Sequence, residues 1–333
     1  MRRIAAILLA LGMSLSGAIA QAENDAPNGP GAGGPSIEEP AAPTFDREAE
    51  LERLQPFLDD EEKAVEAVRQ FDRLQQRLAS WDNDLAELYA AEGDADLSRV
   101  ATERARERMQ AVYTAYKQIL ERYPDNARAH NFIGEVEYDW LGYEAPALAS
   151  WKRSRELDDQ LAAPRNNLAI YYSHVGEYEQ SLQLFDEVMA LEPDNPDYLF
   201  NLTQIFLIHP RHIEAHYGID RAEVYRRAME MSRKAASLLP GDYTLTQDYA
   251  VNHFAAQNFG VTADWAEAAK AWQAAREAVR RSDELFYTWL NEGRVWLRAE
   301  NNKEAARCFR EALAILPESE IAQQLLERAE GGG

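Results

Sequence analysis

Residues 162–195 read AAPRNNLAIYYSHVGEYEQSLQLFDEVMALEPDN, and this stretch decides the fold. Apolar side chains recur three and four residues apart in both halves, for example at Leu168 in the first and Phe185 in the second, which indicates two amphipathic helices. Residues 176–178, Gly-Glu-Tyr, give a turn signal between the halves, and Pro193 closes the second helix because proline cannot continue it. The stretch therefore predicts a helix pair.

The same ending recurs along the chain. Pro124, Pro193, Pro240 and Pro317 each follow a helical stretch of similar composition, and the first two lie close to twice a ~34-residue period apart. Such a period is typical of stacked helix pairs, because one pair cannot cover its apolar stripe alone and its neighbour completes the cover. The sequence predicts an array over residues 127–317, with units at about 127–161, 162–195, 196–240, 241–283 and 286–319.

Small and large side chains occupy fixed places in these units. The first halves carry Gly134, Ala169 and Gly293, and a small side chain there lets the two helices of one unit approach closely. We expect the large side chains of the second halves to fill the gap to the next unit, which makes most of the aromatic content structural. These large side chains are Trp151, Phe185, Trp272 and Phe309.

With this pattern the chain resembles the tetratricopeptide repeat proteins over most of residues 127–319. The resemblance implies an all-α fold, a right-handed α-solenoid of stacked antiparallel helix pairs. Residues 318–330 are expected to form a capping helix, because an open-ended stack needs a more polar last layer.

Residues 45–126 are predicted to form N-terminal helices that include a degenerate repeat. A long helix is expected from about residue 97 to just before Pro124. An earlier helix is indicated by apolar residues at three- and four-residue steps, which we expect on one face. They are Val65, Val68, Phe71, Leu74 and Leu78.

Residues 1–22 have the pattern of a secretory signal peptide. Arg2 and Arg3 precede a short apolar run that ends at small-x-small cleavage sites. Residues 23–44 are rich in Pro and Gly and are expected to be a disordered linker. We expect an exported protein in a bacterial periplasm with no membrane span after cleavage. The alternatives are a secreted protein and one anchored to the membrane by an uncleaved signal.

Composition excludes several classes of function. The chain has 333 residues and a formal net charge of −22, which argues against nucleic-acid binding because neutralising phosphates needs clustered cations. Its single cysteine, Cys308, excludes an internal disulfide framework and a four-thiolate zinc site. The sequence lacks a Gly-rich phosphate loop and a Gly-x-Ser-x-Gly elbow. We therefore expect a protein that is not an enzyme and that uses no cofactor.

The family resemblance implies binding of protein or peptide segments in a concave groove lined by the first helices. The family's Lys/Asn/Arg clamp for a terminal carboxylate does not carry over, because Asn131, Asn166 and Phe200 stand at the matching places. Arg294 and Arg298 are the groove residues that could meet an anion. The full predicted groove set is Asn131, Glu135, Tyr138, Asn166, Ile170, His174, Phe200, Gln204, Arg294 and Arg298.

The leading hypothesis is therefore an exported scaffold or adaptor that helps assemble or maintain an envelope complex, with a partner whose identity the sequence does not give. One alternative is a metal site at His209, His212 and His216, since the last two are four residues apart and would share a helix face. A second alternative is a structural subunit of a larger assembly whose groove holds no ligand.

Overall fold

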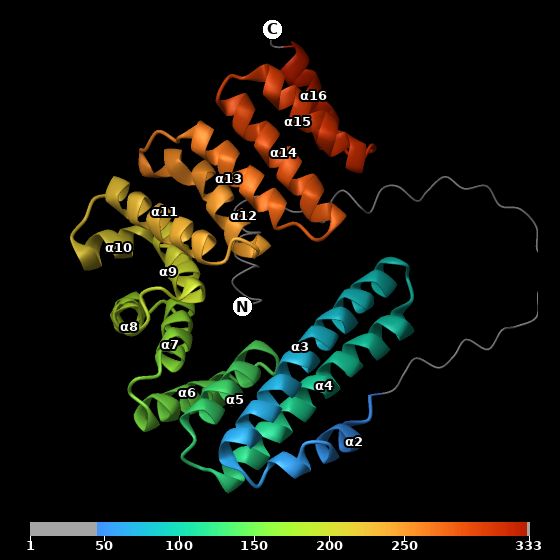
Figure 1. Cartoon of the computed structure of the whole chain (residues 1–333), viewed down its shortest axis with the longest axis vertical. Helices are drawn as coiled ribbons and strands as arrows, with labels where there is room; N and C mark the ends of the chain where they lie inside the picture. The colour runs from blue at the N-terminus through green and yellow to red at the C-terminus, as the bar shows by residue number, and fades with distance from the viewer. Residues whose placement is uncertain (1–44, 332–333) are drawn as a thin grey trace, which may run out of the picture. The chain divides into compact units, whose positions relative to one another are not determined.

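The computed structural model describes residues 45–331, and every regular element in that range is a helix. These residues form two compact units, of which the first ends at Asn167 and the second begins at Leu168. Figure 1 shows the helices in chain order, from α2 to α16. The predicted signal peptide and linker, residues 1–22 and 23–44, lie outside the described residues.

A long helical hairpin dominates the first unit. Helices α3 (Glu61–Ala91) and α4 (Ala95–Arg122) pack along each other (Figure 1). Asp60 caps α3 by accepting a hydrogen bond from the Lys63 backbone N–H at 3.0 Å. The unit also contains α2 (Arg47–Glu52), the short 3-10 turn η2 (Gln55–Phe57), α5 (Ala127–Asp139), α6 (Glu144–Leu157) and the start of α7 (Ala162–His174).

The buried face of α3 follows the predicted apolar pattern only over its first half. Val65, Val68 and Phe71 are buried, but Leu74 is 43% exposed. Leu74 and Gln75 lie three and four residues after Phe71, so helix geometry permits either to continue the face, and the packing on α4 buries Gln75. The buried face of α3 therefore continues through Gln75 and leaves Leu74 exposed.

Ion pairs hold the outer half of the hairpin together. The Asp82 carboxylate is buried and accepts hydrogen bonds from Nε of Arg104 and Nε of Arg108, each at 2.7 Å. Arg108 also donates from Nη1 to Oε1 of Gln75 at 3.0 Å. Two guanidinium groups on one carboxylate satisfy the charge that burial would otherwise leave unpaired.

The second unit is a succession of helix pairs. It contains the rest of α7 with α8 (Tyr178–Leu191), α9 (Pro196–Ile208) with α11 (Arg221–Leu238), α12 (Tyr243–Asn252) with α13 (Trp265–Glu277), and α14 (Ser282–Arg298) with α15 (Asn302–Ile315). Two extra elements account for the longer units: α10 (Pro210–Tyr217) before α11, and the 3-10 helix η3 (His253–Phe259) after α12. The last helix, α16 (Glu320–Gly331), packs on α15.

The all-α class and the antiparallel helix pairs predicted from the sequence are confirmed. Helix α14 begins at Ser282, earlier than the 286 expected for its unit, and Oε2 of Glu284 in its first turn accepts a hydrogen bond from the Arg281 backbone N–H at 3.2 Å. Within residues 45–331, no helix is both long enough and apolar enough to cross a membrane.

A glycine of the first helix lies directly against a large ring of the second helix in two of the pairs. A Cβ added at Gly134 would lie 2.5 Å from Nε1 of Trp151, and one at Gly293 would lie 2.8 Å from Cδ1 of Phe309. Both rings are almost completely buried. Trp151 and Phe309 therefore fill space inside their own pair, and Phe309 also belongs to a buried cluster with Ala322 and Ala329 of α16.

We predict that Gly134→Ala and Gly293→Ala each lower the free energy of unfolding by roughly 1–3 kcal/mol, because the added methyl group forces the ring out of its place. This loss exceeds the ~1 kcal/mol that alanine gains over glycine inside a helix. Urea titration followed by circular dichroism measures the change.

Gly241→Ala is the matched control, because a Cβ at Gly241 meets no atom within 4 Å. Its free energy of unfolding should stay within about 0.5 kcal/mol of the wild type. Equal stability of all three variants would show that the ring contacts do not set the helix spacing.

Candidate functional site

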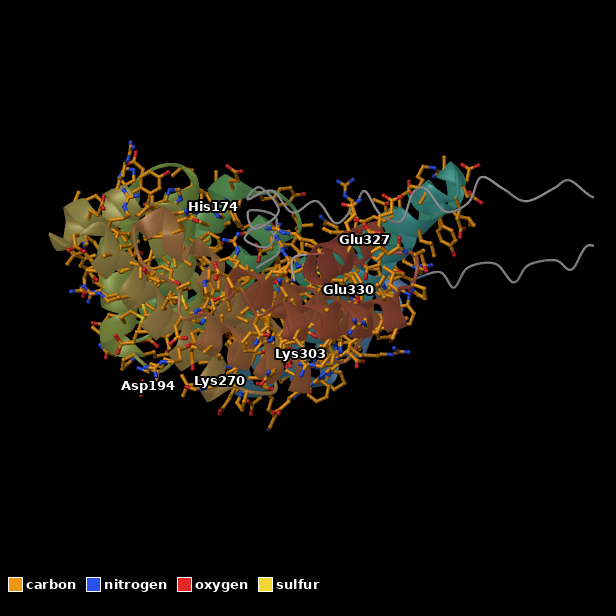
Figure 2. The ribbon with its side chains drawn as sticks, turned by 90° about the horizontal axis from the view of Figure 1, so that it is seen from above. His174, Asp194, Lys270, Lys303, Glu327 and Glu330 are labelled. Carbon is orange, nitrogen blue, oxygen red and sulfur yellow. The ribbon has the colours of Figure 1, made fainter. Side chains whose placement is uncertain are left out.

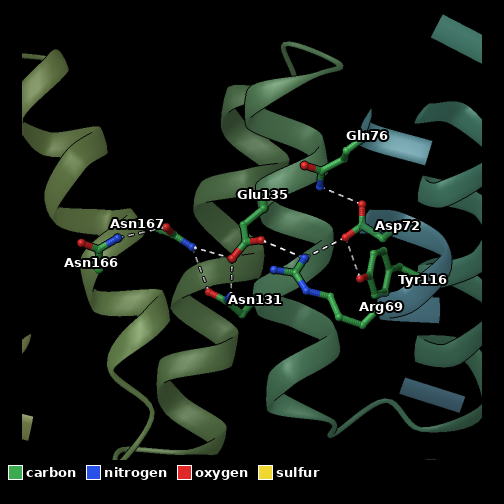
Figure 3. Close-up of polar contacts among 8 residues, drawn as sticks. All are labelled: Arg69, Asp72, Gln76, Tyr116, Asn131, Glu135, Asn166 and Asn167. Carbon is green, nitrogen blue, oxygen red and sulfur yellow. Dashed lines mark hydrogen bonds and ion pairs between the residues drawn. The ribbon is translucent and has the colours of Figure 1, made fainter. Parts of the chain in front are cut away.

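Three of the predicted groove residues in the first unit belong to one polar network, centred on Glu135 (Figure 3). Oε1 of Glu135 accepts hydrogen bonds from Nδ2 of Asn131 at 2.8 Å and from Nδ2 of Asn167 at 3.4 Å. Nδ2 of Asn167 also donates to Oδ1 of Asn131 at 3.0 Å, and Nδ2 of Asn166 donates to Oδ1 of Asn167 at 3.4 Å. The network therefore connects α5 to the start of α7.

Arg69 on α3 links this network to the hairpin (Figure 3). Its Nη1 lies 3.2 Å from Oε2 of Glu135 and 2.7 Å from Oδ2 of Asp72. The guanidinium group also stacks over the Phe132 ring, with Cζ 4.0 Å from the centroid. One cation thus neutralises two carboxylates that come from helices far apart in the sequence.

Asp72 is fully buried and has two further donors (Figure 3). The Tyr116 hydroxyl donates to its Oδ2 at 3.0 Å, and Nε2 of Gln76 donates to its Oδ1 at 2.8 Å. Because every charged group here has a partner inside the unit, the network stabilises the packing of α3, α4, α5 and α7.

Burial raises the pKa of Glu135, although the Arg69 guanidinium opposes the rise. Asn131 is only 1% exposed, and Asn166 and Tyr138 are also buried, the last against the Trp151 ring with centroids 5.4 Å apart. These predicted groove residues therefore lie mostly inside the unit.

A second network surrounds Asp248 in the second unit, and it uses another predicted groove residue. The buried carboxylate of Asp248 accepts hydrogen bonds from Nε2 of Gln204 at 2.8 Å, Oγ of Ser232 at 2.7 Å and Nδ2 of Asn252 at 2.9 Å. The three donors are neutral. Burial therefore dominates and raises the pKa of Asp248 to about 6.

The remaining predicted groove residues of the second unit are more accessible. Ile170 and Phe200 are half-buried, and Phe200 packs beside Leu199 and Leu245. His174 is exposed at the end of α7 (Figure 2).

Arg294 and Arg298, one turn apart on α14, lie next to two aromatic rings. Cζ of each arginine is 5.7 Å from the Phe254 centroid, and Cζ of Arg298 is 5.6 Å from the Trp265 ring. The two rings contact each other with centroids 5.9 Å apart. We call these four residues, from η3, α13 and α14, the arginine–aromatic patch.

The two arginines of the patch lack the carboxylate partners that some other cations of the second unit have. Nζ of Lys234 lies 2.5 Å from Oδ1 of Asp194, and Nζ of Lys270 lies 3.9 Å from Oε2 of Glu267. Figure 2 shows Asp194 and Lys270 on the outside of the helices. Neither arginine of the patch forms an ion pair with any residue between 45 and 331; Arg294 donates only to the Asn291 amide oxygen, at 3.1 Å.

Burial and the neighbouring Arg298 cation lower the pKa of Arg294, although Tyr287 opposes the effect. An anion placed between the two guanidinium groups would relieve this repulsion. The patch is therefore the part of the predicted groove set with unsatisfied charge.

The three clustered histidines make separate contacts. Tyr178 on α8 stacks on His212 with centroids 4.0 Å apart and contacts His209 at 4.5 Å. His216 instead lies 3.1 Å from both Oε2 of Glu179 and Oδ2 of Asp186. Residues 45–331 contain no group of three or more His, Cys, Asp or Glu side chains arranged to hold a metal ion. The contacts hold α10 against α8.

The sequence reasoning missed Arg69, Asp72 and Asp248. Asp72 and Gln75 interrupt the apolar face of α3, and a polar residue at a core position is a signal of a buried network. The residues of each network are far apart in the sequence; Arg69 and Glu135, for example, are separated by 66 positions. Periodicity alone therefore could not identify the networks.

We predict that Asp248 makes folding stability depend on pH between about 4 and 6. The folded pKa is about 6 against an ordinary value of 3.8, so near pH 5 the folded chain binds more protons than the unfolded one. This contribution to stability is complete below pH 3.8 and falls by about 1 kcal/mol per pH unit as pH rises towards 6.

Chemical denaturation at several pH values tests this dependence. Asp248→Asn should flatten the slope, whereas Asp159→Asn, at an exposed position, should keep it. A slope that Asp248→Asn leaves unchanged would assign the pH dependence to other groups.

Comparison with known proteins finds no matching family model. The Photosystem I assembly protein Ycf3 of Prochlorococcus marinus (strain MIT 9215) is 29% identical over 115 residues, which are 33% of this chain and 66% of that protein. The chain thus spans just under two thirds of that relative's length.

Two solved structures are similar in fold. YrrB, described as a TPR protein with an unusual peptide-binding site, has a TM-score of 0.46 and 17% identity, covering 64% of this chain and 97% of that one. PilW, described as a widely conserved type IV pilus biogenesis factor, has a TM-score of 0.48 and 15% identity, covering 74% of this chain and 98% of that one. The antiparallel helix pairs, the glycine–ring contacts inside them and the proline-terminated repeats give this chain a tetratricopeptide-type fold of packed helix pairs.

Proposed function

We propose that the chain is an exported, non-catalytic scaffold that binds protein or peptide segments on the first-helix side of its repeats. The family fold supports this proposal, because stacked first helices present a row of side chains to an extended partner. The Ycf3 relative is named for the assembly of a protein complex. We place the role in the assembly or maintenance of an envelope complex, since residues 1–22 have the pattern of a secretory signal.

The observation that carries the proposal is the arginine–aromatic patch. Arg294 and Arg298 have no carboxylate partner within the described residues of a chain whose net charge is −22. A guanidinium group can hold a carboxylate through two parallel hydrogen bonds. Phe254 and Trp265 add apolar contact beside the charge. The partner segment should therefore carry a carboxylate next to an apolar or aromatic side chain.

The buried acidic groups support a role other than catalysis. Glu135 and Asp248 are held in structural networks, and Glu292 is fully buried against Arg276, Gln273 and Trp296. Burial raises the pKa of the Cys308 thiol to about 12, which makes it a poor nucleophile.

We predict that the double variant Arg294→Gln/Arg298→Gln binds partner segments at least tenfold more weakly, because charge-assisted hydrogen bonds contribute roughly 1.5–3 kcal/mol each. Crosslinked capture from a native envelope extract would first identify the segment by mass spectrometry. A synthetic peptide of that segment, titrated by fluorescence anisotropy, then gives the affinity, which should fall as salt rises.

Arg211→Gln/Arg280→Gln is the matched control, since both side chains are exposed on the second unit and the change in net charge is the same. This control should bind like the wild type. Equal binding by both double variants would remove the patch from the site, and capture of no segment at all would favour the alternative of a structural subunit.

A further inference from the structure

The outer half of α3 carries an exposed apolar stripe. Trp81 is 64% exposed, Leu88 is 51% exposed, and Leu74 is exposed as well. Leu78 and Leu85 lie between them and are half-buried. These five residues, which we call the α3 stripe, follow one another at steps of four, three, four and three residues.

The stripe is distinct from the face that packs on α4. With 3.6 residues per turn, it lies about 110° around the helix from the row formed by Gln75, Ala79 and Asp82. That row is buried, and Asp82 is held there by Arg104 and Arg108. Over this half, the side of α3 that faces α4 carries ion pairs and the side that faces solvent carries leucines. An ordinary surface helix has its apolar residues on the packed side and its charged residues on the solvent side.

Steps of four and three residues make the seam of a left-handed coiled coil, so the spacing selects a helix as the occupant. The order of the side chains is also nearly symmetric about Trp81. Leucines precede it by three and seven residues and follow it by four and seven. A two-fold interface requires a surface that is complementary to itself, and this pattern provides one when two such helices run antiparallel.

The charges beside the stripe have the same symmetry with opposite signs. Arg73 and Arg77 precede Trp81 on one flank, and Asp84 and Glu87 follow it on that flank. Neither arginine forms an ion pair inside the described part of the chain. Two antiparallel copies bring Arg77 of each beside Asp84 of the other, because an antiparallel pair places this flank of one helix against the same flank of its partner.

We propose that the α3 stripe is a homodimer interface, in which α3 packs antiparallel on α3 of a second copy across a two-fold axis at Trp81. The interface joins two hairpins into a four-helix arrangement. It is independent of the arginine–aromatic patch, which lies in the second unit. The dimer therefore presents two copies of the peptide-binding surface.

Sedimentation equilibrium of the full chain tests the dimer. Trp81→Ser should raise the dissociation constant roughly thirtyfold, since a central tryptophan is a typical hot spot. Ile321→Ser, at a position 50% exposed on α16, should leave it unchanged. A chain that stays monomeric at concentrations on the order of 100 µM, where even weak interfaces are populated, overturns the proposal, as does a dimer that Trp81→Ser does not weaken.

Engineered cysteines test the direction of the helices. In the antiparallel arrangement the double variant Leu74→Cys/Leu88→Cys should form disulfide-linked dimers, because residue 74 of one copy faces residue 88 of the other. The single variants should not, since their thiols would be about 20 Å apart at 1.5 Å rise per residue. Crosslinking of Leu74→Cys to itself would reveal a parallel pair and contradict the two-fold at Trp81.

Reversing the charges at positions 77 and 84 distinguishes self-pairing of α3 from binding of a helix of another protein. Arg77→Glu should weaken the dimer, and adding Asp84→Arg in the same chain should restore it. Because both positions are on the surface, circular dichroism should be unchanged in each variant. Weakening without restoration overturns the self-pairing.

Discussion

The contact between a glycine on the first helix and a ring on the second sets the distance at which a helix pair closes. At Gly134 and Gly293 there is no space for even one more carbon atom beside Trp151 and Phe309. Because protein interiors are packed as densely as organic crystals, this contact fixes how far the first helices stand from the second. The apolar cover that each pair gives its neighbour depends on that distance, and so does the placement of Arg294 one residue beyond Gly293.

Local spacing was enough to predict the helix pairs, because helix periodicity, turn glycines and terminal prolines are read over a few residues. The polar networks were not predictable in this way. Arg69 and Glu135 lie 66 positions apart and meet only after the hairpin has packed on α5. The family resemblance also led us to expect Asn131, Asn166 and Gln204 on an accessible groove surface. Burial with satisfied hydrogen bonds is the other solution for an amide, and only the packed structure distinguishes the two.

Acidic side chains have two different roles in this chain. Most are exposed and keep the surface strongly negative, whereas Asp72, Asp82 and Glu292 are buried against arginines. Asp248 alone among the networks described has neutral donors only, which is why its pKa rises to about 6. Arg294 and Arg298 are an exception, because they contact aromatic rings and no carboxylate within the described residues. Their place on the repeat could be predicted from the sequence, but the aromatic rings around them could not.

The buried Asp82 also has a consequence for how the hairpin aligns. Leucine faces can slide past each other by one turn at little cost, but a carboxylate held by two guanidinium groups has one position at which all partners meet. Sliding α4 along α3 by a turn would leave three charges without water and without partners. The ion pairs thus fix the register of α4 along α3, although they add little net stability. The register in turn decides which residues form the tip of the hairpin and which side of α3 carries the exposed leucines.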